Sequence, residues 1–145
     1  MSLLNKAIIG RVELVTLPAF ELEDLEAKID TGADSSALHC TNIAFHEDHT
    51  VSFHVLDANH PSYVSKTFRL PIHALKKVKS SNGVSKKRAF IKTEISLYGH
   101  IYPIVLSLTD RSYMAMPMLL GRKFLEGRFL VDVSLNHTFK QRKKP

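Results

Sequence analysis

Hydrophobic and polar residues alternate in short runs along most of the chain, a pattern that predicts β-strands rather than helices. The runs carry β-branched or aromatic residues, and turn-forming residues separate them at 57–61, 80–83 and 98–100. Short strands at this close spacing favour an all-β barrel or sandwich. The segments that we expect to form strands are 11–17, 25–29, 50–56, 66–70, 88–97 and 101–108.

One segment, "GRKFLEG", is typical of a short helix because it begins at Gly121, ends at Gly127 and lies between two apolar runs. A chain of 145 residues, 44% hydrophobic, predicts a single domain over 1–145 with one core. We expect that core to span about residues 10–134, followed by a basic tail over 139–145. The predicted fold class is therefore all-β, with one short helix after Gly121.

The tetrapeptide "SSNG" lies between two basic arms, and its Asn-Gly pair is a strong signal for a β-hairpin turn. An arm of this length could project from the barrel, although an ordinary surface hairpin carries the same signal. The four turn residues are Ser80, Ser81, Asn82 and Gly83.

The net charge is +6, and the cations gather in residues 76–88 and in the tail. A basic surface suits nucleic acid, anionic lipid or an acidic peptide. Aromatic residues for base stacking are scarce near both segments, so nucleic-acid binding is not predicted. No run of 18 apolar residues and no signal-peptide pattern are present, which indicates the cytoplasm and no membrane partner.

The stretch "AKIDTGADSSALH" raises the question of chemistry, because Asp30 follows an apolar approach where a strand should be buried. A buried acid costs free energy unless it has partners. A turn explains a bare Asp-Thr-Gly, since Asp and Gly are turn residues. The other interpretation is an active site, and the downstream segment "MLLGRKFL" over 118–125 favours it.

"DTGAD" followed by "LLGR" resembles the retropepsin-like aspartic peptidases, with "SSNG" placed where their flap hairpin would be. Together, "KIDTGADSSALH", "VKSSNG" and "MLLGRKFLEGRFLVD" also resemble the bacterial family named ATP-dependent zinc proteases, which shares the retropepsin-like fold. Members of that family are associated with ATP-grasp glutamate ligases. The resemblance covers about residues 10–134 and implies a closed retropepsin-like barrel.

The resemblance implies a catalytic role for Asp30, in a loop packed against Met118–Gly121. It also implies an ion pair at hydrogen-bonding distance between Asp34 and Arg122, and the hydroxyl of Thr31 could pin the loop through a buried hydrogen bond. Ser35, Ser36 and Lys123 depart from the retroviral pattern. The implied loop residues are Thr31, Gly32, Ala33 and Asp34, the supporting residues are Leu119, Leu120, Gly121 and Arg122, and the flap is 80–83.

An aspartic mechanism needs two carboxylates, and the chain holds one Asp-Thr-Gly. The second must come from another copy across a two-fold axis. We therefore expect an aspartic endopeptidase in which a dyad, formed across a homodimer, activates a water. The alternative is a non-catalytic peptide-binding module that partners an ATP-grasp ligase or an acidic tail. The expected substrate is a peptide or protein, and the basic arms favour an acidic one.

Zinc-dependent hydrolysis is a lesser alternative. The sequence has no H-E-x-x-H motif and no cysteine pair, and its best metal-binding cluster is "HEDH" over 46–49. No phosphate-binding loop is present, so ATP would act on a partner, and we assign neither metal nor cofactor. Catalysis by Cys40 with His39 is not expected, because adjacent strand residues point to opposite faces. Cys40 is expected to be buried.

Overall fold

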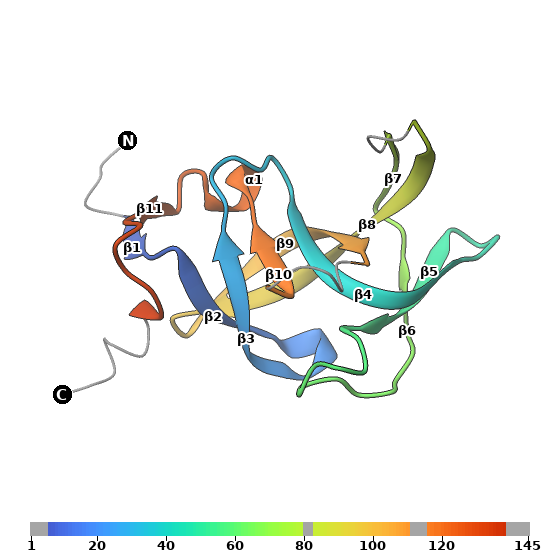
Figure 1. Cartoon of the computed structure of the whole chain (residues 1–145), viewed down its shortest axis with the longest axis horizontal. Coiled ribbons are helices and arrows are strands. Elements are labelled where there is room, and N and C mark those ends of the chain that lie inside the picture. Colours follow the sequence, from blue (N-terminus) through green and yellow to red (C-terminus); the bar gives the residue numbers. More distant parts are fainter. Residues whose placement is uncertain (1–5, 80–82, 111–115, 139–145) are drawn as a thin grey trace.

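The computed structural model describes residues 6–79, 83–110 and 116–138, most of which lie in strands (Figure 1). The strands are β1 (Ala7–Ile9), β2 (Val12–Leu17), β3 (Leu22–Ile29), β4 (Ser36–Phe45), β5 (Thr50–Val55), β6 (Phe68–Pro71), β7 (Ala74–Lys79), β8 (Ser85–Leu97), β9 (His100–Thr109), β10 (Met118–Leu120) and β11 (Phe129–Val131). A 3-10 turn covers Pro18–Phe20, and the helix α1 covers Arg122–Leu125.

Six strands close into a barrel in the order β10-β3-β2-β8-β9-β4, and the pairing of β10 with β4 completes the ring. Strand β10 runs parallel to β3 and antiparallel to β4. The predicted all-β class, the closed barrel and the short helix after Gly121 are confirmed.

The alternation of hydrophobic and polar residues correctly predicted strands that have one side toward solvent. In β2, for example, buried and half-buried residues strictly alternate. Strand β4 was missed. Its first five residues, 36–40, are all buried, so no alternation marks them. A strand covered on both faces has no period-2 signal in its sequence.

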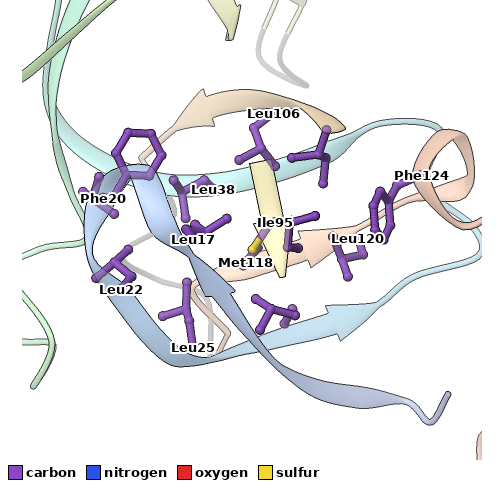
Figure 2. Close-up of a cluster of buried hydrophobic side chains, with 14 of the residues drawn as sticks. Leu17, Phe20, Leu22, Leu25, Leu38, Ile95, Leu106, Met118, Leu120 and Phe124 are labelled. Carbon is purple, nitrogen blue, oxygen red and sulfur yellow. The ribbon is translucent and has the colours of Figure 1, made fainter. Parts of the chain in front are cut away.

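The core fills the barrel with side chains from every one of its strands (Figure 2). Met118 and Leu120 of β10 are fully buried and lie among residues of the neighbouring strands. Burying a side chain of this size contributes about 1.5–3 kcal/mol, so even a three-residue strand anchors the barrel firmly. The side chains labelled beside them include Leu17, Leu25, Leu38, Ile95 and Leu106.

Three smaller units extend from the barrel (Figure 1). Strands β5 and β6 extend β4 into a side sheet, and β7 pairs with the first half of β8 as a projecting hairpin. Strands β1 and β11 pair in parallel at the opposite end of the molecule. Among the described residues, no helix is long and apolar enough to cross a membrane.

A buried carboxylate ties the two ends of the described chain to the barrel. Glu13 on β2 is only 1% exposed. It accepts hydrogen bonds from the backbone N–H of Gly10 at 2.7 Å, and from the backbone N–H and hydroxyl of Thr138 at 3.0 and 2.8 Å. Three donors converge on one carboxylate, so its two oxygens are well satisfied.

We expect Glu13→Gln to lower the free energy of unfolding by about 1–3 kcal/mol, because the new NH₂ group would face a donor where an acceptor is needed. Urea unfolding at neutral pH measures this. Glu26→Gln is the matched control: Glu26 lies on the surface 3.2 Å from His137, and its loss should cost less than about 0.5 kcal/mol. Equal effects of the two variants would contradict the prediction.

Candidate functional site

Asp30 lies immediately after β3, where β10 ends beside it. Its backbone N–H donates to the carbonyl of Leu120 at 2.9 Å, which continues the parallel pairing of Ile29 with Leu120. Asp30 is half-buried. The expected packing of this loop against Met118–Gly121 is therefore confirmed.

The Asp-Thr-Gly loop is a tight turn built around Asp30. The N–H of Gly32 donates to Oδ1 of Asp30 at 2.9 Å, and the N–H of Ala33 donates to its carbonyl at 3.2 Å. A Cβ at Gly32 would lie 3.2 Å from the same Oδ1, so glycine leaves room for the carboxylate. Thr31 is exposed, and the expectation that its hydroxyl forms a buried bond is wrong for the isolated chain.

The first turn of α1 binds the other side of this loop. The N–H groups of Arg122 and Lys123 donate to the carbonyls of Ala33 and Asp34 at 2.7 and 3.1 Å. These N–H groups lack partners within the helix, and the loop supplies them. Gly121 donates to Oγ of Ser36 at 3.0 Å, so three successive backbone donors fix the loop between β3 and β4.

The ion pair between Asp34 and Arg122 differs from the expectation. Their closest atoms are 3.8 Å apart, beyond hydrogen-bonding distance, and Nη1 of Arg122 donates to the carbonyl of Thr31 at 3.1 Å. Nζ of Lys123 comes nearer to Asp34, at 3.2 Å. The helical turn brings the lysine to the carboxylate first, and all three side chains are more than half exposed, so the contacts are weak.

A groove of about 490 Å³ opens beside the loop and is lined by β4, β7, β8, β9 and the segment from α1 to Arg128. Ser35 and Ser36 form its border with the Asp-Thr-Gly loop. Among the residues that the structure describes, its lining includes four cationic side chains and one histidine, and no acid. These five residues are Lys76, Lys92, Lys123, Arg128 and His73.

The hairpin of β7 and β8 forms one wall of this groove. Its strands pair from Ala74 with Phe90 to Lys79 with Ser85, and Nζ of Lys76 lies 4.8 Å from the centre of the Phe90 ring. Gly83 has a φ of +85°, which suits a turn. The predicted hairpin arms are confirmed. The other predicted flap residues, Ser80, Ser81 and Asn82, lie outside the described residues.

Sequence reasoning did not identify Lys92 and Arg128 as groove residues. Lys92 lies in a strand that was predicted, but its outward direction into the groove depends on how β8 pairs with β9. Arg128 follows Gly127, whose φ of +78° turns the chain after α1. A basic residue after a glycine is too common in sequence to have indicated a site.

The "HEDH" cluster lies on the side sheet, where Nε2 of His46 bonds Oγ of Ser52 at 2.8 Å. Within the described ranges, no group of three or more His, Cys, Asp or Glu side chains could hold a metal. Cys40 is completely buried in the core, and burial raises the pKa of its thiol well above the usual value. The prediction of a buried Cys40 is confirmed.

His39 is buried, and its Nε2 lies 2.6 Å from Oδ2 of Asp57. Asp110 approaches the other ring nitrogen, with 3.8 Å between Nδ1 and Oδ1. The hydrogen bond with His39 and a second one from the N–H of Asn59 lower the pKa of Asp57. The pair joins β4 to the segment after β5, away from the Asp-Thr-Gly loop.

Comparison with known proteins places these features in a family. A family model described as "RimB-like: Retropepsin-like aspartic endopeptidase RimB" matches residues 8–142. A crystal structure of a Legionella pneumophila protein with unknown function aligns with a TM-score of 0.74 and 32% identity, covering 92% of this chain and 98% of that one.

Two curated relatives carry the name "Probable alpha-L-glutamate ligase". The one from Parasynechococcus marenigrum is 34% identical over 136 residues, which cover 92% of this chain and 29% of the relative. The one from Shewanella halifaxensis is 36% identical over 137 residues, with 90% and 29% covered. The chain therefore spans less than a third of the length of these relatives.

We expect the contribution of Asp57 to stability to depend on pH. Its pKa is lowered in the folded state, so the contribution is fully present above the ordinary aspartate pKa, near 3.8, and is lost as pH falls through the lower folded value. Urea unfolding should show a larger difference between wild type and Asp57→Asn at pH 6 than at pH 3. Asp24→Asn is the control for a lost surface charge on β3, and at pH 6 it should lower the free energy of unfolding less than Asp57→Asn does.

We expect Gly121→Ala to destabilise the protein by about 1–3 kcal/mol and to displace the Asp-Thr-Gly loop, because a Cβ there would lie 2.5 Å from the carbonyl oxygen of Ser35. Gly99→Ala is the control, since its φ of +77° also disfavours a side chain and it lies in the turn between β8 and β9. Thermal melting should show both variants destabilised, and amide chemical shifts of 30–35 should change only in Gly121→Ala. Unchanged loop shifts in Gly121→Ala would contradict this.

Proposed function

Because the chain belongs to the RimB-like family of retropepsin-like aspartic endopeptidases, we propose that it hydrolyses peptide bonds by an aspartic mechanism, with Asp30 as the catalytic carboxylate. The observation that carries the proposal is the way Asp30 is held. Backbone groups of Leu120 and Gly32 fix its main chain and its Oδ1, while the residue stays half exposed. Peptide hydrolysis by an aspartic mechanism needs a carboxylate that is fixed in position and open to water.

The mechanism requires a second Asp30 from another copy of the chain. Two carboxylates held close together share one proton, because both cannot ionise at that distance. The ionised carboxylate accepts a proton from a water, which attacks the peptide carbonyl. The protonated carboxylate donates a hydrogen bond to the carbonyl oxygen and stabilises the charge that develops there.

The exposure of the loop supports a homodimer. Thr31 and Gly32 are exposed in the single chain although they flank the proposed catalytic carboxylate. A two-fold axis beside this loop would bring two copies of Asp30 together and cover both loops at once. Each copy would also contribute its own groove, so a peptide could cross the dyad and contact both chains.

The charge of the groove supports an acidic peptide as substrate. A peptide with Asp or Glu side chains would offset the cations that line it, and their attraction would accelerate binding at low salt. The relatives named as glutamate ligases favour a ligand that carries glutamate, or a ligase as partner. The same groove fits the second candidate function, which is a peptide-binding module without turnover.

We expect Asp30→Asn to reduce turnover of an acidic peptide substrate by about 10²-fold to 10⁴-fold or more, because the amide cannot accept the proton from water. The amide is nearly isosteric, so the melting temperature should change little. A fluorogenic peptide assay measures turnover, and Asp24→Asn is the control for a lost surface charge. Peptide binding without turnover by the wild-type protein would select the binding module instead.

Activity should also fall on dilution and peak at mildly acid pH, where the dyad holds one proton. Chelators should have little effect, because the proposed chemistry uses no metal. Sedimentation of the active protein should show a dimer. Full activity in a strict monomer, or activity removed by a chelator and restored by zinc, would contradict the aspartic mechanism.

A further inference from the structure

We propose that Arg128 binds a carboxylate group of the peptide and so sets the specificity of the groove. The proposal rests on the proposed function to the extent that it takes the groove as the peptide site. It does not require turnover, because a peptide-binding module would use the same contact. Three features of Arg128 carry it: its guanidinium is held in place, it has no acidic partner among the described residues, and it lies in the groove that borders the Asp-Thr-Gly loop.

The guanidinium of Arg128 is fixed by two aromatic rings and one carbonyl. Its central carbon lies 5.6 Å from the centre of the Tyr102 ring and 5.1 Å from that of Phe124. Nη1 donates to the carbonyl of Phe124 at 2.8 Å. These contacts hold the side chain before a ligand arrives, so little rotamer entropy is lost on binding.

The charge of Arg128 has no acidic partner within 4.0 Å among the described residues, although the residue is half-buried. An arginine stays protonated, and a partly buried charge without a counter-charge is costly. The guanidinium has five N–H donors, and the contacts described above use one of them. The remaining donors suit a carboxylate, which a guanidinium can bind through two parallel hydrogen bonds.

The other cations of the groove are less suited to this role. Lys123 already lies 3.2 Å from the carboxylate of Asp34, and Lys76 lies over the ring of Phe90. Lys92 is exposed and carries its charge on a flexible stem. Arg128 therefore offers the best prepared site for a planar anion.

The position of Arg128 relates the carboxylate to the proposed chemistry. Arg128 and Phe124 line the groove together with Ser35, and Ser35 belongs to the loop that begins at Asp30. The first turn of α1 is bonded to that loop, so the guanidinium and the loop belong to one connected unit. The bound carboxylate has two possible sources, an Asp or Glu side chain and the C-terminal carboxylate of the peptide.

The test is peptide binding to protein that carries Asp30→Asn, which prevents turnover from obscuring affinity. Fluorescence anisotropy would measure the dissociation constants of three labelled peptides: a hexapeptide of Glu with a free C-terminus, the same peptide amidated, and an amidated hexapeptide of Gln. Each is measured in this background alone and with Arg128→Gln, Arg128→Lys or Arg69→Gln. Arg69→Gln is the control, since Arg69 is an exposed arginine paired with Asp48 on the side sheet.

We expect Arg128→Gln to weaken binding of the free Glu peptide by about 10-fold to 100-fold and that of the Gln peptide by less than about 3-fold. Arg128→Lys should fall between Arg128→Gln and the background protein, because it keeps the charge and loses the planar fork. Arg69→Gln should bind all three peptides like the background protein. Circular dichroism and thermal melting identify any variant that fails to fold, and the lysine variant then supplies the comparison.

The amidated Glu peptide identifies the source of the carboxylate. If its affinity still depends on Arg128, a side-chain carboxylate is bound, and if the dependence disappears, the C-terminal carboxylate is bound. Equal losses for the Glu and Gln peptides, a similar loss in Arg69→Gln, or no binding of any peptide by the background protein would overturn the proposal. These outcomes leave the proposed hydrolysis to be judged by the turnover assay of Asp30→Asn.

Discussion

The hydrogen bond from the N–H of Asp30 to the carbonyl of Leu120 is the contact on which the site depends. It exists because the short strand β10 enters the barrel between β3 and β4 and completes the ring. The same three residues therefore close the barrel, fill its core with Met118 and Leu120, and end beside the acid. The pairing of β10 both closes the barrel and positions the carboxylate, so a substitution that disrupts β10 would affect both.

Gly121 begins a run of backbone donors that holds the loop between β3 and β4. Its N–H binds Ser36, and the next two N–H groups, at the start of α1, bind the carbonyls of residues 33 and 34. A helix of four residues has little stability of its own, because its nucleus costs more free energy than so few bonds return. The loop supplies the partners that the helix lacks, and Phe124 and Leu125 anchor it in the core. Loop and helix are therefore formed together, and neither would keep this geometry alone.

The elements that sequence could predict are those whose signal is local. The alternation of hydrophobic and polar residues predicted β2, β8 and β9. Two glycines indicated where α1 begins and ends, and the Asn-Gly pair indicated the β7–β8 hairpin. The first half of β4 could not be found, because both its faces are covered and its residues are uniformly buried. The Asp-Thr-Gly loop and its apolar-Gly-Arg support were found from their motifs, but the nearer approach of Lys123 to Asp34 depends on the helix direction. The role of Arg128 depends on rings from β9 and α1 that only the fold brings together.

The structure separates what one chain provides from what the proposed chemistry requires. One chain contains a closed barrel, a core that fills it and a carboxylate fixed by its own backbone. The loop residues Thr31 and Gly32 are nevertheless exposed in the single chain, and in the proposed dimer a second copy would cover them. A protein organised in this way can be stable as a single chain and still be inactive, with association supplying the second carboxylate. Under the proposed mechanism, such an arrangement would confine hydrolysis to the assembled state.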